Sequence, residues 1–127
     1  MSAAGCTIRA ARPDDVAAIH GLIGELADYE RLREQFTGSA ETLERHLFGE
    51  PRYAQALVAQ RPDGAIVGFA LYFFNYSTFL CRPGLYLEDL YVQPGARRQR
   101  TGTLLLTELA RRAVAAGCGR LEWAVLD

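Results

Sequence analysis

The sequence predicts a mixed α/β fold whose elements follow the order β-α-α-β-β-β-α-β. The spacing of apolar residues is helical in two early segments, strand-like between residues 53 and 92, and helical again before a last strand. The 127 residues, of which 50% are apolar, are enough for one hydrophobic core. Because no repeat or long linker divides the chain, we expect residues 1–127 to form a single domain.

The first strand and the first helix are marked by local signals near the N-terminus. Residues Cys6 to Ala10 have the character of a short strand. Pro13 suits the first turn of a helix, and Asp14 and Asp15 are favourable at the positive end of a helix dipole. The apolar stripe that follows consists of Val16, Ile19, Ile23 and Leu26. This spacing predicts an amphipathic helix over residues 13 to about 29.

A second, short helix is expected after a polar segment. Ser39 is a good N-cap residue, and Leu43 and Leu47 supply an apolar face one turn apart. Gly49 suits the end of this helix.

Three strands follow the second helix. The segments 53–60 and 65–76 are joined by Arg61-Pro62-Asp63-Gly64, whose proline and glycine favour a turn, so we expect a hairpin. The second of these segments is apolar on both faces, which predicts a central strand. Residues 84–92 form the third strand, and Pro94-Gly95 ends it.

The chain closes with a helix and a strand. The expected apolar face of the helix consists of Leu106, Leu109, Ala110 and Ala113. On the other face Glu108 can pair with Arg111 and Arg112, and Gly117 suits the helix end. The strand at 120–126 should lie parallel to the strand at 84–92, because a crossover through one helix joins parallel strands.

The charge composition excludes several classes of function. All 14 basic residues are arginines, so Schiff-base chemistry, a Walker P-loop and a kinase active site, each of which needs a lysine, are ruled out. The net charge of −1 offers no general field for nucleic acid. We therefore expect no nucleic-acid partner.

The cysteines and histidines predict neither a disulfide framework nor a metal site. Cys6, Cys81 and Cys118 are odd in number and far apart, and His20 and His46 belong to no metal-binding pattern. This cysteine usage indicates a reducing compartment, so we expect the cytoplasm. No apolar run is long enough to cross a bilayer, and we expect no membrane partner.

The region 85–106 combines carboxylates on a strand with a polar turn that opens a helix. The unpaired N–H groups of a helix start carry the positive end of the dipole and can hold a phosphate or pyrophosphate. Many strand-to-helix turns share this pattern. On spacing alone, Glu88 and Asp89 either belong to an active site beside an anion-binding turn or are solvated carboxylates on a strand edge.

The sequence resembles the diamine acetyltransferases of the spermidine/spermine and thialysine type, a branch of the GCN5-related N-acetyltransferase (GNAT) superfamily. The residues that carry the resemblance are Ile8-Arg9, ELADYE at 25–30, IVGFALYFFNYSTF at 66–79 and YLEDLYVQP at 86–94. The chain is similar to the N-terminal three quarters of these proteins. The resemblance implies a GNAT-like mixed sheet and transfer of an acetyl group from acetyl-CoA to a primary amine of a small diamine, polyamine or lysine-like substrate.

The resemblance also implies where acetyl-CoA binds. The cleft lies where the strand at 84–92 splays from the next parallel strand, and main-chain groups of Leu90, Tyr91 and Val92 hold the pantetheine and the thioester. The pyrophosphate lies on a turn that corresponds to Arg97, Arg98, Gln99, Arg100, Thr101, Gly102 and Thr103.

On the amine side, Glu88 corresponds to the residue that contacts the substrate ammonium and removes its proton, and Asp89 lines the same area. Both are candidate catalytic residues, while Tyr29 and Glu30 belong to the groove for the amine. An alkyl ammonium, with a pKa of about 10.4, becomes a nucleophile only when it loses a proton, which a carboxylate can accept. A main-chain N–H from Val92 or its neighbour would stabilise the oxyanion that forms on attack.

The turn departs from the family pattern Arg/Gln-x-x-Gly-x-Gly/Ala, because only Arg97 and Gly102 fit. Glycine allows close approach to the pyrophosphate and a positive φ, which costs an arginine about 1 kcal/mol or more. Arg98 and Arg100 can instead pair with phosphates through their side chains. Arg98 is equally well explained as part of an exposed basic turn.

A second departure lies at the C-terminal end. The family continues past Asp127 with a helix that carries the tyrosine that protonates the departing thiolate, and with a closing β-hairpin. We therefore expect a fold that stops before that helix and hairpin, with an exposed strand edge at 120–126 that favours a homodimer. The alternative function is a catalytically impaired acetyltransferase remnant that acts as a dimerising or weak CoA-binding module.

Overall fold

The computed structural model describes residues 2–3 and 5–124. The strands are β1 (Ser2–Ala3), β2 (Cys6–Ala10), β3 (Gln55–Gln60), β4 (Ile66–Ser77), β5 (Arg82–Val92) and β6 (Arg120–Trp123). The α-helices are α1 (Val16–Tyr29), α2 (Ala40–Phe48) and α3 (Thr101–Ala115). Short 3-10 helices occur at η1 (Pro13–Asp15), η2 (Arg33–Gln35) and η3 (Pro94–Gln99). Apart from the two-residue β1, the order of strands and α-helices is the one that the sequence predicts.

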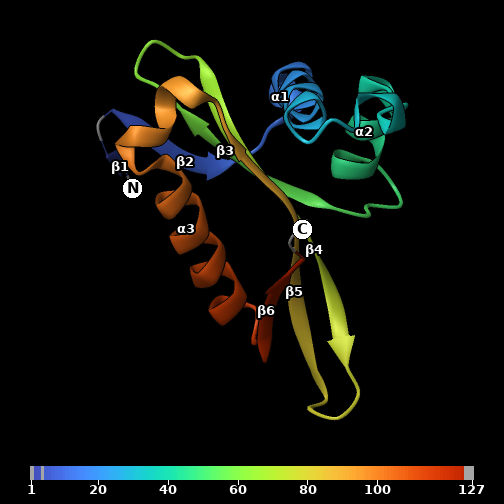
Figure 1. Ribbon diagram of the computed structural model, residues 1–127. Coiled ribbons are helices and arrows are strands. Elements are labelled where there is room, and N and C mark those ends of the chain that lie inside the picture. The colour runs from blue at the N-terminus through green and yellow to red at the C-terminus, as the bar shows by residue number, and fades with distance from the viewer. Residues whose placement is uncertain (1, 4, 125–127) are drawn as a thin grey trace.

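The described strands form one sheet in the order β1-β2-β3-β4-β5-β6. The first five strands pair antiparallel, whereas β5 and β6 are parallel. The strands on either side of α3 are therefore parallel, as predicted, and β4 is a central strand as expected. Figure 1 shows α1 and α2 on one face of the sheet and α3 on the other.

Side chains that alternate along the strands form two hydrophobic clusters, one on each face of the sheet. On β3, Leu57 and Ala59 pack with Leu105 and Leu109 of α3, whereas Val58 packs on the opposite face. That opposite cluster contains Ile19, Leu22 and Leu26 of α1 and Leu47 of α2. Both faces are covered, which explains why β3 and β4 have the continuous apolar sequences of buried strands.

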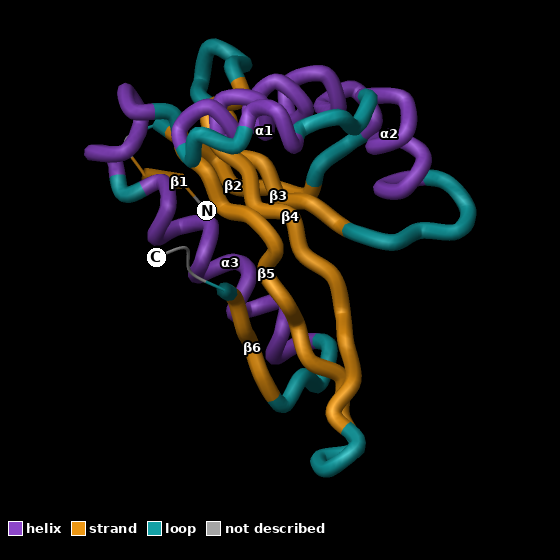
Figure 2. Tube along the Cα trace, turned by 45° about the vertical axis from the view of Figure 1, so that its right-hand side comes forward, coloured by secondary structure: helices purple, strands orange, loops and turns teal. Residues whose placement is uncertain are grey.

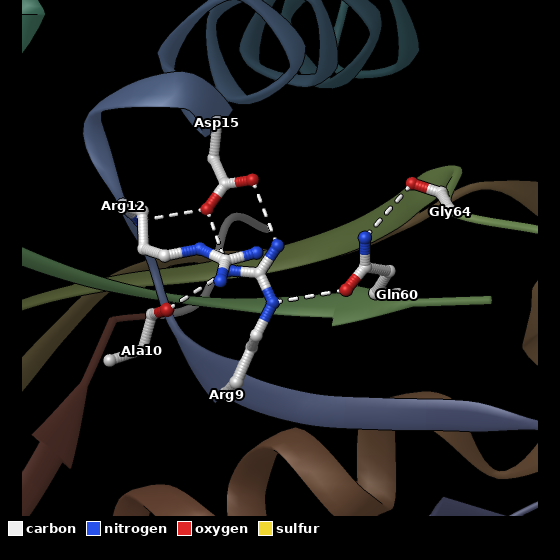
Figure 3. A network of polar contacts seen from close by, with 6 residues as sticks. All are labelled: Arg9, Ala10, Arg12, Asp15, Gln60 and Gly64. Atoms are coloured by element: carbon white, nitrogen blue, oxygen red, sulfur yellow. Dashed lines mark hydrogen bonds and ion pairs between the residues drawn. The ribbon is translucent and has the colours of Figure 1, made fainter. Parts of the chain in front are cut away.

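The start of α1 is held by an ion pair rather than by the helix dipole alone. Two guanidinium nitrogens of Arg9 on β2 donate to the Asp15 carboxylate at 2.7 and 3.0 Å, and the Arg12 main-chain N–H donates to the same carboxylate at 2.7 Å. Nε of Arg9 also donates to Gln60 on β3 (Figure 3). Asp15 is buried, so the network fixes the entry of α1 onto the sheet.

The ends of the other helices agree with the sequence signals. The Ser39 hydroxyl accepts a hydrogen bond from the Thr42 N–H, as expected of an N-cap. At the end of α2, a β-carbon at Gly49 would lie 2.7 Å from the Arg45 carbonyl oxygen, so no larger residue fits there. After α3, Gly117 has a φ of 76°, the left-handed conformation that favours glycine.

The buried face of α3 differs from the expected one. Its buried residues are Thr101, Leu105, Leu109 and Ala113, which are spaced four apart. Leu106 and Ala110, predicted to face the core, are exposed instead. Neighbouring leucines at 104–106 make several apolar stripes equally plausible from the sequence, and the packing against β5 selects one of them. Glu108 pairs with Arg111 and Arg112 as expected.

The hairpin of β4 and β5 extends beyond the rest of the molecule both in the ribbon of Figure 1 and in the tube of Figure 2. The shorter hairpin of β3 and β4 turns at Arg61, whose carbonyl accepts the Gly64 N–H at 2.9 Å. The long hairpin places one half of β5 beside β6 and leaves the other half near the helices α1 and α3. The boundary between the two halves lies in the carboxylate-bearing segment.

Candidate active site

A β-bulge interrupts β5 at Glu88. Leu71 of β4 pairs with Asp89 and the next residue, Tyr72, pairs with Leu87, so Glu88 has no opposite residue on β4. A bulge bends its strand and increases the local twist. The bulge thus changes the direction of β5 at the point where the sequence places its two neighbouring carboxylates.

The pairing between β5 and β6 stops at the same point. It runs from Gly84 and Arg120 to Leu87 and Trp123, and beyond Leu87 the outer edge of β5 has no partner strand within the described residues. The strands therefore separate next to the bulge.

The alternation of the ladder shows which main-chain groups face this opening. The Gln93 N–H donates to the Val67 carbonyl, and the register continues through the pairs Phe69–Tyr91 and Leu71–Asp89. Because bonded and non-bonded pairs alternate in an antiparallel ladder, the N–H and C=O groups of Leu90 and Val92 point away from β4. They face the side of β5 from which β6 has separated.

The first of two adjoining cavities is the carboxylate cavity, of about 260 Å³. Glu88 and Asp89 of β5 and Glu30 at the end of α1 supply its charges. Its other lining residues are Leu26, Leu87, Leu90, Leu106, Trp123 and Ala124. Among the described residues no arginine lines this cavity, so its field is that of three acidic side chains against an apolar wall.

Asp89 is the titratable residue that this environment affects most clearly. Burial, then the neighbouring charges of Glu88 and Glu30, raise the pKa of Asp89 to about 6. A carboxyl group with this pKa exchanges a proton close to neutral pH, which suits a general base. The rise has a local structural cause, because the bulge and the end of α1 bring three carboxylates together.

The second cavity is the turn cavity, of about 440 Å³. Most of its lining residues are ones that the sequence predicts to hold acetyl-CoA or the amine, namely Tyr29, Glu30, Leu90, Tyr91, Val92, Arg97, Arg100, Gly102 and Thr103. A β-carbon at Gly102 would point toward the side chains of Leu90 and Val92 at about 4 Å. A glycine there keeps the approach from the turn to the strand edge open. Leu26, Glu30 and Leu90 line both cavities.

Arg100 directly precedes α3 and has a φ of 60° and a ψ of 23°, in the left-handed region. Glycine adopts this conformation freely, whereas an arginine adopts it at a cost. The strained residue is the one that stands where the family pattern has a glycine. The Arg100 side chain is exposed and lines the turn cavity without filling it.

Arg97 lies between two aromatic rings above the strand edge. Its guanidinium carbon is 5.3 Å from the centre of the Tyr29 ring and 5.6 Å from that of Tyr91. Its Nε donates to the Val92 carbonyl oxygen at 2.8 Å. One of the outward main-chain groups of Val92 is thus bound by a side chain, while its N–H faces the opening.

Thr101 is a predicted turn residue whose side chain does not line the cavity. The side chain of Thr101 is buried in the core, where its hydroxyl donates to the Ala96 carbonyl, so only its main chain can serve a ligand. The side chains of Arg98 and Gln99 lie outside the described part of the structure. Tyr29 and Glu30, which were expected in the groove for the amine, lie at the end of α1; Glu30 lines both cavities, whereas Tyr29 lines only the turn cavity.

Sequence reasoning missed several residues that line or support the cavities. Leu106 and Trp123 form part of the apolar wall of the carboxylate cavity, although one was expected in the core and the other only on an edge strand. Glu25 accepts hydrogen bonds from Tyr91 and Gln93 of β5. A signal for Glu25 was present, because this acid lies between the buried residues Leu22 and Leu26 on α1.

Neither a metal centre nor a membrane-spanning helix is found in the described part of the chain. Residues 2–3 and 5–124 contain no group of three or more side chains suited to hold a metal ion. No helix within that part of the chain is long and apolar enough to cross a membrane.

Comparison with known proteins agrees with this geometry. Residues 19–127 match the model of the Acetyltransferase (GNAT) family. The chain is 42% identical to a thialysine N-epsilon-acetyltransferase from Bos taurus, over 94% of this chain and 74% of the relative. It is 30% identical to the L-ornithine N5-acetyltransferase NATA1 from Arabidopsis thaliana, over 94% of this chain and 72% of the relative.

Solved structures show the same fold. A probable acetyltransferase superposes with a TM-score of 0.81 at 19% identity, over 94% of this chain and 79% of that one. An aminoglycoside acetyltransferase from an uncultured soil sample, in complex with sisomicin, gives a TM-score of 0.79 at 18% identity, over 97% and 79% of the two chains. The family match and the thialysine acetyltransferase relative carry the assignment: the chain belongs to the acetyltransferase (GNAT) family.

Proposed function

We propose that the protein transfers an acetyl group from acetyl-CoA to a primary amine of a small diamine, polyamine or lysine-like substrate. The observation that carries the proposal is the bulge at Glu88, which opens the sheet between a cluster of carboxylates and the outward-facing main-chain groups of Leu90 and Val92. The named activities of the thialysine and ornithine acetyltransferase relatives support the class of substrate.

The residues around the turn cavity fit acetyl-CoA. Gly102 leaves the approach open, the first N–H groups of α3 point out of the turn, and Arg97 supplies positive charge for phosphates. The outward N–H and C=O groups of Leu90 and the N–H of Val92 can pair with the amides of a pantetheine arm as a neighbouring strand would. When bound, acetyl-CoA supplies a thioester that an amine can attack.

The carboxylate cavity provides the other half of the chemistry. Glu30, Glu88 and Asp89 attract an ammonium group and hold it beside the strand edge. Asp89, with its pKa raised to about 6, accepts the proton directly or through water, with Glu88 at its side. The Val92 N–H then donates to the thioester oxygen on which negative charge develops when the amine attacks. As the amide forms, the carbon–sulfur bond breaks and CoA leaves as its thiol after taking up a proton.

Trp123 offers a direct test, because it is the one tryptophan of the chain and lines the carboxylate cavity. Titration with CoA and acetyl-CoA should change its fluorescence. In a second assay, acetyl-CoA and a panel of diamines, polyamines and lysine analogues should release free thiol. Glu88→Gln and Asp89→Asn should each reduce thiol release at least tenfold.

Glu44→Gln is the matched control, because Glu44 is an exposed acid on α2 that lines neither cavity. This variant should release thiol at the rate of the unchanged protein. The proposal is wrong if CoA leaves the Trp123 fluorescence unchanged and no amine of the panel releases thiol.

A second candidate is favoured by Arg100. An arginine held at φ 60° where the family pattern has glycine adds strain and a side chain to the phosphate turn. In this alternative the protein is a catalytically impaired remnant that binds CoA weakly and dimerises. Fluorescence changes with CoA but no thiol release with any amine would favour it.

We further propose that the protein forms a homodimer across β6. This strand lies at the edge of the described sheet, and edge strands present unpaired main-chain groups. A second copy pairing along β6 would satisfy them.

A further inference from the structure

Glu25 binds both neighbours of Val92 from another element of the fold. The Tyr91 hydroxyl donates to one oxygen of the Glu25 carboxylate at 3.1 Å, and Nε2 of Gln93 donates to the other at 3.0 Å. Glu25 lies on α1 and is half-buried. One carboxylate therefore fixes the residues on both sides of Val92. In the proposed function, the main-chain N–H of Val92 stabilises the oxyanion.

This part of β5 depends on such anchors more than an ordinary strand does. Beyond Leu87 its outer edge has no partner strand within residues 2–3 and 5–124, so the ladder to β4 holds it from one side only. The outward groups of Val92 must nevertheless keep a fixed position. Donors aimed at a developing charge are effective only when they are held in place beforehand.

The anchoring continues to Arg97. The ring of Tyr91, oriented by its bond to Glu25, forms one wall of the site in which the Arg97 guanidinium lies, and the exposed Tyr29 forms the other. Arg97 in turn donates to the Val92 carbonyl. Contacts thus lead from Glu25 through Tyr91 and Arg97 to Val92.

We propose that Glu25 is a positioning residue of the acyl-CoA cleft, which acts through Tyr91, Gln93 and Arg97 to fix the main chain at Val92. The inference rests on the proposed function, since it assigns the strand edge to the pantetheine and thioester. Glu25 lines neither cavity, so its proposed role does not depend on contact with a ligand. It predicts a loss of binding confined to the arm of CoA that contacts the strand.

The first experiment needs no ligand. In a proton–nitrogen correlation spectrum, the Arg97 Nε–H should be shifted upfield by the Tyr91 ring, and Arg97→Lys identifies the signal by removing it. Glu25→Ala should move the signal toward its random-coil position. Glu25→Gln should move it less, because one amide oxygen still accepts one of the two bonds. Glu44→Ala, in an exposed acid of α2, is the matched control and should leave the signal in place.

The second experiment compares two ligands by calorimetry. CoA contacts both the turn and the strand edge, whereas adenosine 3′,5′-bisphosphate lacks the pantetheine arm. Loss of hydrogen bonds to the charged Glu25 should weaken CoA about tenfold in Glu25→Ala, with a smaller loss in Glu25→Gln. The affinity for the bisphosphate should change less than about twofold, because its contacts lie on the turn.

The outcomes separate this inference from the proposed function. An Arg97 signal that stays in place in Glu25→Ala overturns the inference, as does equal weakening of both ligands, which would mean that Glu25 only stabilises the fold. A signal that moves as expected in a protein that binds no CoA overturns the proposed function and, with it, the role in the cleft. A moved signal with selective loss of CoA affinity supports both.

Discussion

Asp89 is the residue whose charge state matters most to the proposed chemistry. Its pKa of about 6 arises first from burial and then from Glu88 and Glu30, and the unfolded chain has the ordinary value near 3.8. Between these values the folded protein binds a proton that the unfolded chain has lost. The free energy of unfolding therefore falls as the pH rises from about 4 to 6, and the cost persists at neutral pH.

Asp89→Asn removes this cost, so it should raise the free energy of unfolding at pH 7.5. We expect a gain of about 1 to 2 kcal/mol, below the full value of the pKa shift because solvent screens a half-buried group. The gain should shrink to nothing as the pH falls to about 4. Urea unfolding at the two pH values measures it, with Glu44→Gln as control. An equal gain at both values would contradict the assigned pKa.

Arg100 gives a second prediction for a single residue. Arg100→Gly relieves the left-handed strain but adds freedom to the unfolded chain, so we expect a net gain in the free energy of unfolding of only about 0.5 kcal/mol. The same change should also increase the affinity for CoA, because the turn proposed to hold the phosphates no longer carries the Arg100 side chain.

Arg31→Gly is the matched control for Arg100→Gly. Arg31 has a φ of 59° and lines neither cavity, so its replacement should give a similar stability gain with no effect on CoA. Calorimetry compares the two variants. If Arg100→Gly weakens CoA, the guanidinium binds phosphate and its charge outweighs the strain.

Arg100 and Asp89 differ in how much of their structural environment the sequence predicts. The glycine of the family pattern at the position of Arg100 pointed to a backbone that can need a positive φ, and the observed φ of 60° agrees with this. The raised pKa of Asp89 could not be anticipated in the same way. It depends first on the burial of Asp89 and then on the charges of Glu88 and Glu30, and both the burial and the approach of Glu30 arise only from the packing of α1 against β5.

At the level of elements, the start of α1 depends on the Arg9 and Asp15 pair. The hydrogen bond from Arg9 is the main cause of a lowered Asp15 pKa. A lowered folded-state pKa contributes stability that is complete above the unfolded value near 3.8 and is lost as the pH falls through the folded value. The sign is opposite to that of Asp89.

Asp15→Asn should therefore lower the free energy of unfolding at pH 7. Because the change leaves Arg9 partly buried without its partner, we expect a loss of about 2 to 4 kcal/mol. The difference from the unchanged protein should narrow below about pH 4. Asp14→Asn is the control, since Asp14 is exposed on the same turn and should cost little. Urea unfolding over this pH range checks both, and a loss independent of pH would exclude the ion pair as its cause.

The elements themselves were largely predictable, and the exceptions have physical reasons. Caps and turns such as Ser39 and Gly64 act locally, so the sequence alone indicates them. The prediction that Leu106 belongs to the buried face of α3 was wrong. Neighbouring leucines at 104–106 allow more than one apolar face to be drawn from the sequence. The bulge at Glu88 was not predicted, because it is defined by the partner strand β4 rather than by β5.

For the molecule as a whole, the separation of β5 from β6 organises both the cleft and the edge of the sheet. The resemblance to a family was needed to expect this separation, as strand pairing between distant segments leaves little trace in one sequence. Beyond the cleft, the start of β6 adjoins the tip of the β4–β5 hairpin, where Arg120 borders a cavity of about 500 Å³. Tyr76, Phe79 and Leu80 line the same cavity and are 61%, 98% and 51% exposed.

This surface leads to a prediction about assembly. An edge strand beside exposed apolar side chains is a favourable place for a second copy to bind, and a two-fold axis would pair β6 antiparallel with its counterpart. With the axis at Leu121, which lies midway between Arg120 and Glu122 on β6, each of these two residues would face the opposite charge of the second copy. Sedimentation equilibrium should therefore give twice the chain mass of 14.0 kDa.

Charge exchange across this interface tests the dimer without removing apolar surface. Glu122→Arg would set like charges against each other and should weaken the dimer about tenfold. Combining it with Arg120→Glu restores the complementarity in the reverse order and should restore the dimer. If Glu122→Arg sediments as the unchanged protein does, the copies do not pair along β6. If the double variant fails to recover while remaining folded by circular dichroism, the charges do not meet across a two-fold axis.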